Sequence, residues 1–169
     1  LDGLAHAAES LVGRAIGAGD HLRVGTAVQM TTIWAVACAV VASLVIAIAG
    51  GTFIDLMTID ITTRAAARVY LPWAIAAPLL GVWAYQLDGI FIGATATAEM
   101  RQGMLVSFVA FVCAWWLSRP FGNHGLWAAL SFHYAVRAIS LWYYYPAVLR
   151  RIRTLGGRES TPAAVTDAP

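Results

Sequence analysis

One carboxylate, Asp88, lies within a long apolar stretch of the chain. No charged residue occurs between Arg68 and Asp88, which leaves nineteen uncharged positions in a row. An apolar run of about 20 residues is long enough to cross a bilayer as a helix. Because an acid inside a membrane segment is energetically unfavourable, it marks a candidate functional site. The carboxylate could exchange a proton or cation, or it could bond a neighbouring helix as a structural anchor, and both interpretations stay open.

Other titratable side chains lie in or near apolar stretches. Arg137 lies in the middle of the last apolar run, and His133 precedes it by one turn. A mid-membrane arginine needs a partner, so Arg137 is expected either to pair with a carboxylate on another helix or to line a pathway. Near the start of the chain, Asp2 and Glu9 share one side of a helix. They could line a pathway, or they could be polar groups near a helix end. The candidates for an ion or substrate pathway are therefore Asp88, Asp2, Glu9, Arg137 and His133.

The remaining reactive side chains predict neither catalysis nor metal binding. The four histidines and the two cysteines do not have metal-ligand spacing, so we expect no metal site and no cofactor. The sequence contains no nucleophile–base constellation, glycine-rich phosphate loop or HExxH motif, so the chain is not predicted to be an enzyme. Cys38 and Cys113 lie within apolar runs and are expected to remain unpaired. The net charge of +2 gives no reason to expect a nucleic-acid partner.

The composition places these residues in a membrane protein. Hydrophobic residues make up 60% of the 169 residues and charged residues only 12%. Ordinary globular domains carry about twice that share of charge. Strand-type alternation is absent, so the predicted fold class is all-α, a polytopic transmembrane helical bundle surrounded by lipid.

The apolar runs predict about four complete membrane spans plus the end of a fifth. Glycine, proline and charged residues, which are typical of turns and loops, separate the runs. Between two of them, residues 52–63 are expected to form an amphipathic linker, and Thr62 or Thr63 is expected to cap the following helix. The composition changes to Gly, Ser, Thr, Pro and Ala near the end, which is typical of disorder. The predicted organisation is a transmembrane lobe over residues 1–150, with spans over about 1–17 (partial), 24–49, 66–93, 102–118 and 125–147, and a disordered cytoplasmic tail over residues 151–169.

Small residues and prolines indicate how the helices pack. Pairs of glycines four positions apart allow two membrane helices to approach closely. The expected close-packing residues are Gly13 and Gly17 in the first segment and Gly89 and Gly93 after Asp88. Prolines are tolerated inside membrane helices when neighbouring groups satisfy the freed carbonyls. The expected helix-bending residues are Pro72 and Pro78.

The arginines predict the orientation. Cytoplasmic loops of membrane proteins carry an excess of basic residues. One side of the predicted bundle collects seven arginines and the other collects three. The C-terminus is therefore expected in the cytoplasm. The seven are Arg14, Arg23, Arg101, Arg150, Arg151, Arg153 and Arg158, and the three are Arg64, Arg68 and Arg119.

Three stretches carry a resemblance to a known family. They are LDGLAHAAESLVGRAIGAGD near the start, LPWAIAAPLLGVWAYQLDGIFIGAT around Asp88, and GNHGLWAAL before the last span. In this order and spacing they resemble the second half of the multidrug and toxic compound extrusion (MATE) transporters, in particular the DinF-like branch. QLDGIFIGAT and GNHGLW are the most specific stretches, and the resemblance covers most of residues 1–150.

The resemblance implies a fold and a function. Members of this family have two lobes of six transmembrane helices, and this chain would hold the end of helix eight and all of helices nine to twelve. They are secondary antiporters of the bacterial inner membrane that export organic cations and other toxic compounds in exchange for protons or sodium ions. The implied partners are the bilayer, the missing N-terminal lobe, a cationic small molecule and H⁺ or Na⁺. The chain starts without Met inside a helical pattern, so a longer protein is expected.

The resemblance also limits these expectations. The acid credited with proton coupling in the DinF-like branch lies on the first helix, which this chain does not include. In the sodium-coupled branch one acid lies on helix ten, where residues 76–81 hold only Ala, Pro, Leu and Gly. Two alternatives remain: a lipid-linked saccharide flippase of the same superfamily, which a basic cavity would favour, and a non-transporting membrane scaffold or enzyme subunit.

Overall fold

The structure, a computed structural model, describes the backbone of residues 2–159 and the side chains of residues 2–20 and 22–152. This part of the chain is helical throughout apart from short turns, which confirms the all-α prediction. The elements are α1 (Asp2–Gly17), α2 (His21–Met57), α3 (Ile61–Gly93), α4 (Thr97–Ser118), the short 3₁₀ helix η1 (Arg119–Phe121) and α5 (Gly122–Glu159).

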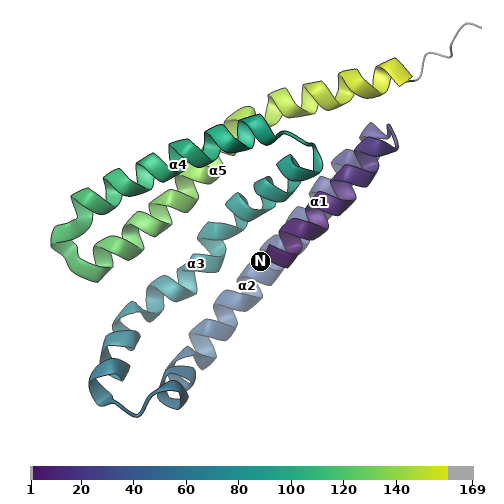
Figure 1. Ribbon diagram of the computed structural model, residues 1–169. Helices are drawn as coiled ribbons and strands as arrows, with labels where there is room; N and C mark the ends of the chain where they lie inside the picture. Colours follow the sequence, from purple (N-terminus) through teal and green to yellow (C-terminus); the bar gives the residue numbers. More distant parts are fainter. Residues whose placement is uncertain (1, 160–169) are drawn as a thin grey trace, which may run out of the picture.

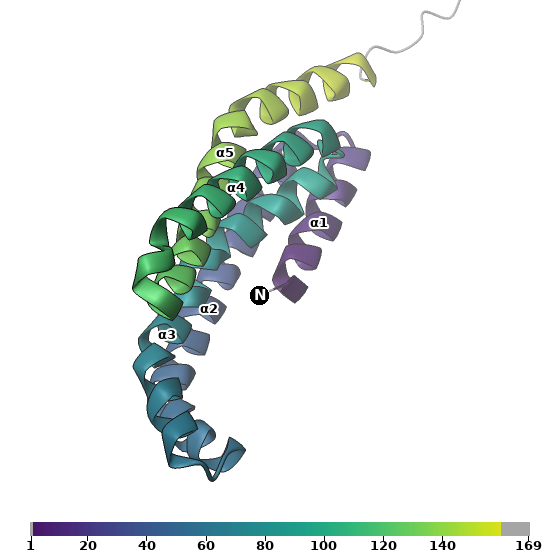
Figure 2. The same ribbon diagram turned by 60° about the vertical axis from the view of Figure 1, so that its left-hand side comes forward.

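The helices form an elongated bundle with α3 at its centre. Figure 1 shows α2 and α3 as one antiparallel hairpin and α4 and α5 as another. The shorter α1 packs against both α2 and α3, and α5 packs against α3. In both views the α2–α3 hairpin extends well beyond the turn of the α4–α5 hairpin (Figures 1 and 2). Helix α3 therefore contacts α1, α2 and α5, with fewer contacts to α4.

Three helical stretches of the described residues are long and apolar enough to cross a membrane. They are Leu22–Met57, Ile61–Gly93 and Thr97–Ile152. The last stretch contains both α4 and most of α5, which fold back on each other at η1, so it accounts for two of the predicted spans. Large apolar side chains such as Ile48 and Leu117 are 82% and 73% exposed, as expected for a surface that contacts lipid.

The turn between α2 and α3 differs from the predicted linker over residues 52–63. Helix α2 continues to Met57, and α3 begins at Ile61, so the connection is very short. Neither predicted threonine caps α3. The N-cap is Asp60, whose carboxylate accepts hydrogen bonds from the Thr63 backbone N–H at 2.8 Å and from the Thr62 and Thr63 hydroxyls at 2.6 Å each. An acidic cap is favoured here because it meets the unpaired N–H groups of the helix start.

The boundaries of α4 and α5 also differ from the predicted ones. The polar residues before 102 already belong to α4, which begins at Thr97. Helix α5 begins at Gly122, directly after η1, and Gly122 has a φ of 58°, a value that glycine adopts readily. The tail predicted from residue 151 is wrong over its first part, because α5 continues to Glu159. Residues 160–169 lie outside the described residues.

Three of the four predicted close-packing glycines, Gly13, Gly89 and Gly93, lie where α1 crosses α3. A Cβ on Gly93 would lie 2.6 Å from the Glu9 carbonyl oxygen, and one on Gly89 would collide with the backbone of Ala5. Gly13 lies on the facing side of the same contact, 3.5 Å from the Gly93 carbonyl oxygen when given a Cβ. Gly89 and Gly93 must be glycine because only a bare backbone permits this approach, whereas a Cβ on Gly13 would make an ordinary contact. A Cβ on Gly17, by contrast, would meet no described atom within 4 Å, so its predicted packing role is not observed.

Both predicted helix-bending prolines lie inside α3, which remains helical through Pro72 and Pro78. Figure 2 shows α3 and its partner α2 following a curved path. Proline removes one backbone hydrogen bond from the helix ladder, so these positions are the local cause available for a bend in α3.

Candidate functional site

Asp88 and Arg137 form an ion pair between α3 and α5. The Arg137 Nη2 donates to Asp88 Oδ1 at 2.7 Å, and Nε donates to Oδ2 at 3.0 Å. The side chains are 20% exposed for Asp88 and 7% exposed for Arg137. This two-point contact is the geometry in which a guanidinium matches a carboxylate best. The partner expected for a mid-membrane arginine is therefore the acid of the central apolar stretch.

A third helix contributes to the same cluster. Arg137 Nη1 donates to the Met104 sulfur of α4 at 3.0 Å. The guanidinium thus contacts side chains of α3 and α4 while its own backbone belongs to α5. Because two opposite charges neutralise each other here, neither is left as an isolated charge in an apolar setting. The arrangement matches the structural interpretation of both residues.

His133 contacts α4. Its Nδ1 lies 3.0 Å from the Ser107 carbonyl oxygen, and since a carbonyl only accepts, the ring nitrogen donates. The ring also packs near Phe111 and Tyr134, with centroids 5.9 Å from each. His133 therefore links α4 to α5 through this hydrogen bond.

The side chains of the predicted acidic stripe on α1 are exposed. His6 Nδ1 lies 3.1 Å from Glu9 Oε2, and His6 Nε2 lies 3.7 Å from Asp2 Oδ2. The Asp2 and Glu9 side chains are 81% and 38% exposed. Sequence spacing predicted this shared face correctly, and the structure separates it from the interhelical Asp88–Arg137 pair.

Asp2 also lines a recess between α1, α3 and α5. The recess has a volume of about 300 Å³ and is bounded by Asp2, Ala77, Pro78, Tyr85 and Tyr134. The Tyr85 and Tyr134 rings lie 6.0 Å apart and are tilted by 44°. A carboxylate beside two phenol rings provides an electrostatic partner and aromatic faces for a positively charged ligand.

A buried amide between α2 and α3 was not among the predicted residues. Gln86, 3% exposed, donates from Nε2 to the hydroxyl oxygens of Thr31 at 2.7 Å and Thr32 at 3.1 Å. Each threonine hydroxyl donates its hydrogen bond to a backbone carbonyl one turn earlier in α2. The hydroxyl oxygens can therefore only accept from Gln86. The amide orientation is thereby determined, and Oε1 has no hydrogen-bond partner among the described residues. The sequence signal that could have identified Gln86 is its position as a polar residue within an apolar run.

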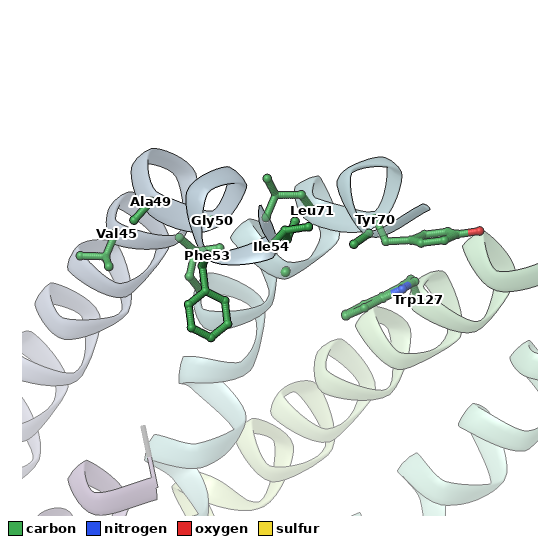
Figure 3. Close-up of a pocket in the computed structure, with 11 residues that line it drawn as sticks. Val45, Ala49, Gly50, Phe53, Ile54, Tyr70, Leu71 and Trp127 are labelled. Atoms are coloured by element: carbon green, nitrogen blue, oxygen red, sulfur yellow. The ribbon is translucent and has the colours of Figure 1, made fainter. Parts of the chain in front are cut away.

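An apolar groove lies at the far end of the α2–α3 hairpin. Figure 3 shows Phe53 and Ile54 of α2, Tyr70 and Leu71 of α3 and Trp127 of α5 around it. Its volume is about 520 Å³. Because no charged residue lines it, the groove suits hydrocarbon and does not include any of the predicted pathway residues.

Comparison with known proteins agrees with this helical membrane architecture. The family model described as MatE matches residues 1–119. The chain belongs to the MatE family. MatE proteins are membrane transporters rather than enzymes, as the resemblance implied.

One curated relative specifies the branch of the MatE family. The chain is 39% identical to DNA damage-inducible protein F of Escherichia coli (strain K12) over 147 residues. The match covers 83% of this chain but only 31% of the relative, so the chain spans about a third of that protein's length. The predicted DinF-like likeness is thereby confirmed. No solved structure matches the chain.

Proposed function

We propose that this chain is the C-terminal lobe of a secondary antiporter that exports organic cations and other toxic compounds in exchange for protons or sodium ions. The observation that carries the proposal is the MatE match over residues 1–119, together with the identity to a bacterial DinF protein. The apolar helices support a multi-pass location in a bacterial inner membrane. The arginine distribution supports a cytoplasmic C-terminus.

Transport would proceed by alternating access, with this lobe moving against an N-terminal lobe. Close backbone contact at Gly89 and Gly93 makes α1 and α3 one rigid unit, which suits movement of the lobe as a body. Pro72 and Pro78 would let the outer part of α3 bend relative to that unit.

The candidate residues take different parts in this proposal. Asp88 and Arg137 hold α3 to α5, since a proton-carrying role for Asp88 would require a two-point ion pair to open. Asp2, with Tyr85 and Tyr134, offers the cationic substrate an exposed carboxylate and aromatic faces. Glu9 extends the acidic face of α1.

The paired state of Arg137 bears on the flippase alternative. A lipid-linked saccharide carries phosphate, which needs an available cation within the lobe. Arg137, the arginine in the middle of a membrane span, is already neutralised by Asp88, so it does not favour that cargo. The scaffold alternative receives no specific support either, because family membership points to transport.

Efflux by the whole two-lobe protein tests the proposal. The protein is expressed in an efflux-deficient bacterial strain loaded with ethidium, and efflux is followed by fluorescence with and without a protonophore or sodium. We expect gradient-dependent efflux, and we expect the Asp2→Asn variant to lose most of it at an unchanged membrane level.

Two controls make the result specific. Asp20→Asn removes a less exposed carboxylate (37%) that pairs with Arg23 in the α1–α2 turn, away from the recess, and it should leave efflux intact. Absence of gradient-dependent efflux in the unaltered protein contradicts the antiporter proposal. Efflux by residues 1–169 alone contradicts the requirement for a second lobe.

A further inference from the structure

The last turns of α5 pack across one end of the helix bundle. Val148 and Ile152 are 3% and 6% exposed and belong to a cluster with Val12 of α1 and Val24 of α2. Figures 1 and 2 both show α5 changing direction so that its final turns pass over the ends of α1 and α4. Pro146 lies inside α5 and provides a local cause for the change. One face of this segment is therefore anchored on the bundle.

Arginines surround the same end of the bundle. Three of them neighbour residues of the buried cluster in sequence: Arg14 precedes Ala15, Arg23 precedes Val24, and Arg151 precedes Ile152. Arg101 lies just after the start of α4, and Arg150 lies on α5 beside Arg151. All of these side chains are exposed: Arg14, Arg23, Arg101, Arg150 and Arg151. We call this group the basic end.

Acidic side chains neutralise only part of the basic end. Arg23 pairs with Asp20 at 2.9 Å, and Arg151 lies 4.0 Å from Glu99. Arg101 and Arg150 contact no carboxylate among the described residues. They leave an excess of positive charge at the level where the apolar helices end.

The opposite end of the bundle is arranged differently. Arg64 and Arg68 both contact Asp55, at 3.7 Å and 2.7 Å. Arg64 also donates to the Thr58 and Asp55 carbonyls at 2.6 and 2.7 Å, which satisfies the end of α2. Arg64 and Arg68 thus bind carboxylate and carbonyl groups of the protein, whereas Arg101 and Arg150 of the basic end remain available to a partner.

We propose that the basic end, through Arg101 and Arg150, binds the headgroups of anionic phospholipids. Helices that cross a bilayer place their terminal residues at headgroup depth, and guanidinium groups pair well with phosphate. The α5 segment after Pro146 has the required two kinds of side chain: Val148 and Ile152 are buried in the cluster, and Arg150 is exposed. Bound lipid would hold this segment over the ends of α1 and α4. The inference does not depend on the transported substrate.

Lipid selectivity tests the proposal. Native mass spectrometry of the detergent-purified protein measures the affinity for phosphatidylglycerol and for phosphatidylcholine with the same acyl chains. A basic residue near a membrane surface contributes attraction that corresponds to about fivefold in affinity. We therefore expect a clear preference for phosphatidylglycerol, reduced about fivefold by Arg101→Gln and by Arg150→Gln. Phosphatidylcholine binding and tryptophan fluorescence should not change, which shows that each variant is folded.

A matched variant and a soluble ligand complete the test. Arg119→Gln removes one exposed arginine at the other turn, where Arg119 lies over the Trp115 ring, and should keep the full preference. Inorganic phosphate at the same concentration as the lipid should not displace phosphatidylglycerol. Equal affinities for the two lipids, an equal loss in Arg119→Gln, or displacement by inorganic phosphate would each overturn the proposal.

Discussion

Removal of one partner from the Asp88–Arg137 pair should destabilise the protein strongly, whereas removal of both should not. Arg137→Met keeps a long apolar side chain near Met104 but leaves the Asp88 carboxylate without its two hydrogen bonds. Asp88→Leu does the reverse and leaves the guanidinium, whose side chain is only 7% exposed, without a counter-charge.

The magnitude follows from the burial of the pair. Loss of one partner of a buried pair typically costs about 3–5 kcal/mol, because the remaining charge is uncompensated. The Asp88→Leu variant should lie at the upper end, since Arg137 is more buried than Asp88. In the double variant Asp88→Leu/Arg137→Met no charge remains, so the loss should be within about 1 kcal/mol of zero.

Reversible unfolding in mixed micelles, followed by circular dichroism, measures these free energies. Arg68→Met serves as a matched control, because the Arg68–Asp55 pair has the same 2.7 Å contact but side chains that are 53% and 38% exposed. An exposed pair of this kind contributes about 0–1 kcal/mol.

Two results would refute the reasoning. One is a double variant whose loss equals the sum of the single losses, because independent effects would mean that the two charges do not stabilise each other. The other is an Arg137→Met variant no less stable than Arg68→Met, because burial would then have no influence on the energy of the pair.

Three further outcomes are expected. Gly93→Ala should lose about 1–3 kcal/mol of stability by pressing a Cβ against the Glu9 carbonyl, whereas Gly17→Ala should change it by less than about 1 kcal/mol; equal thermal unfolding of the two variants would contradict the α1–α3 packing argument. Hydrogen bonds lower the pKa of Asp60 from 3.8 to about 2, so its contribution to stability is present above its ordinary pKa and is lost as the pH falls towards 2. Asp60→Ala should flatten that part of the unfolding profile, and an unchanged profile would count against the cap. A reporter active only in the periplasm and fused after Gly157 should be silent, and a strong signal would reverse the proposed orientation.

Several interactions were predictable one residue at a time but not as pairs. The apolar runs marked Asp88 and Arg137 separately, since a charge in such a run is conspicuous. Their contact joins positions 49 residues apart, and the choice among Asp2, Glu9 and Asp88 as the partner required the packing of α5 on α3. Gln86 was not predicted, and its partners Thr31 and Thr32 lie 55 and 54 residues away, so its hydrogen bonds also depend on the packing of α2 on α3.

Helix ends were less predictable than helix interiors. Charge-free runs identified the spans, but α2, α4 and α5 extend beyond them into polar sequence. A helix continues past its apolar part when the helix propensity of the following residues and the capping residues permit it. Hydropathy predicts neither helix propensity nor capping. The end of α5 is an example. Val148 and Ile152 pack into a buried cluster with residues of other helices, and no local sequence pattern predicts that contact.

The sequence by itself determined the class of this protein. Long charge-free runs allow only helices in lipid, because every backbone polar group must be satisfied within the segment, and the family motifs add the MatE assignment. Tertiary structure alone decided which residues act together. It placed Gly13 but not Gly17 at a helix crossing, paired Asp88 with Arg137, and left Arg101 and Arg150 facing outwards. The physical reason is that hydropathy is a property of one segment, whereas close approach and charge pairing depend on the relative rotation and bending of two helices.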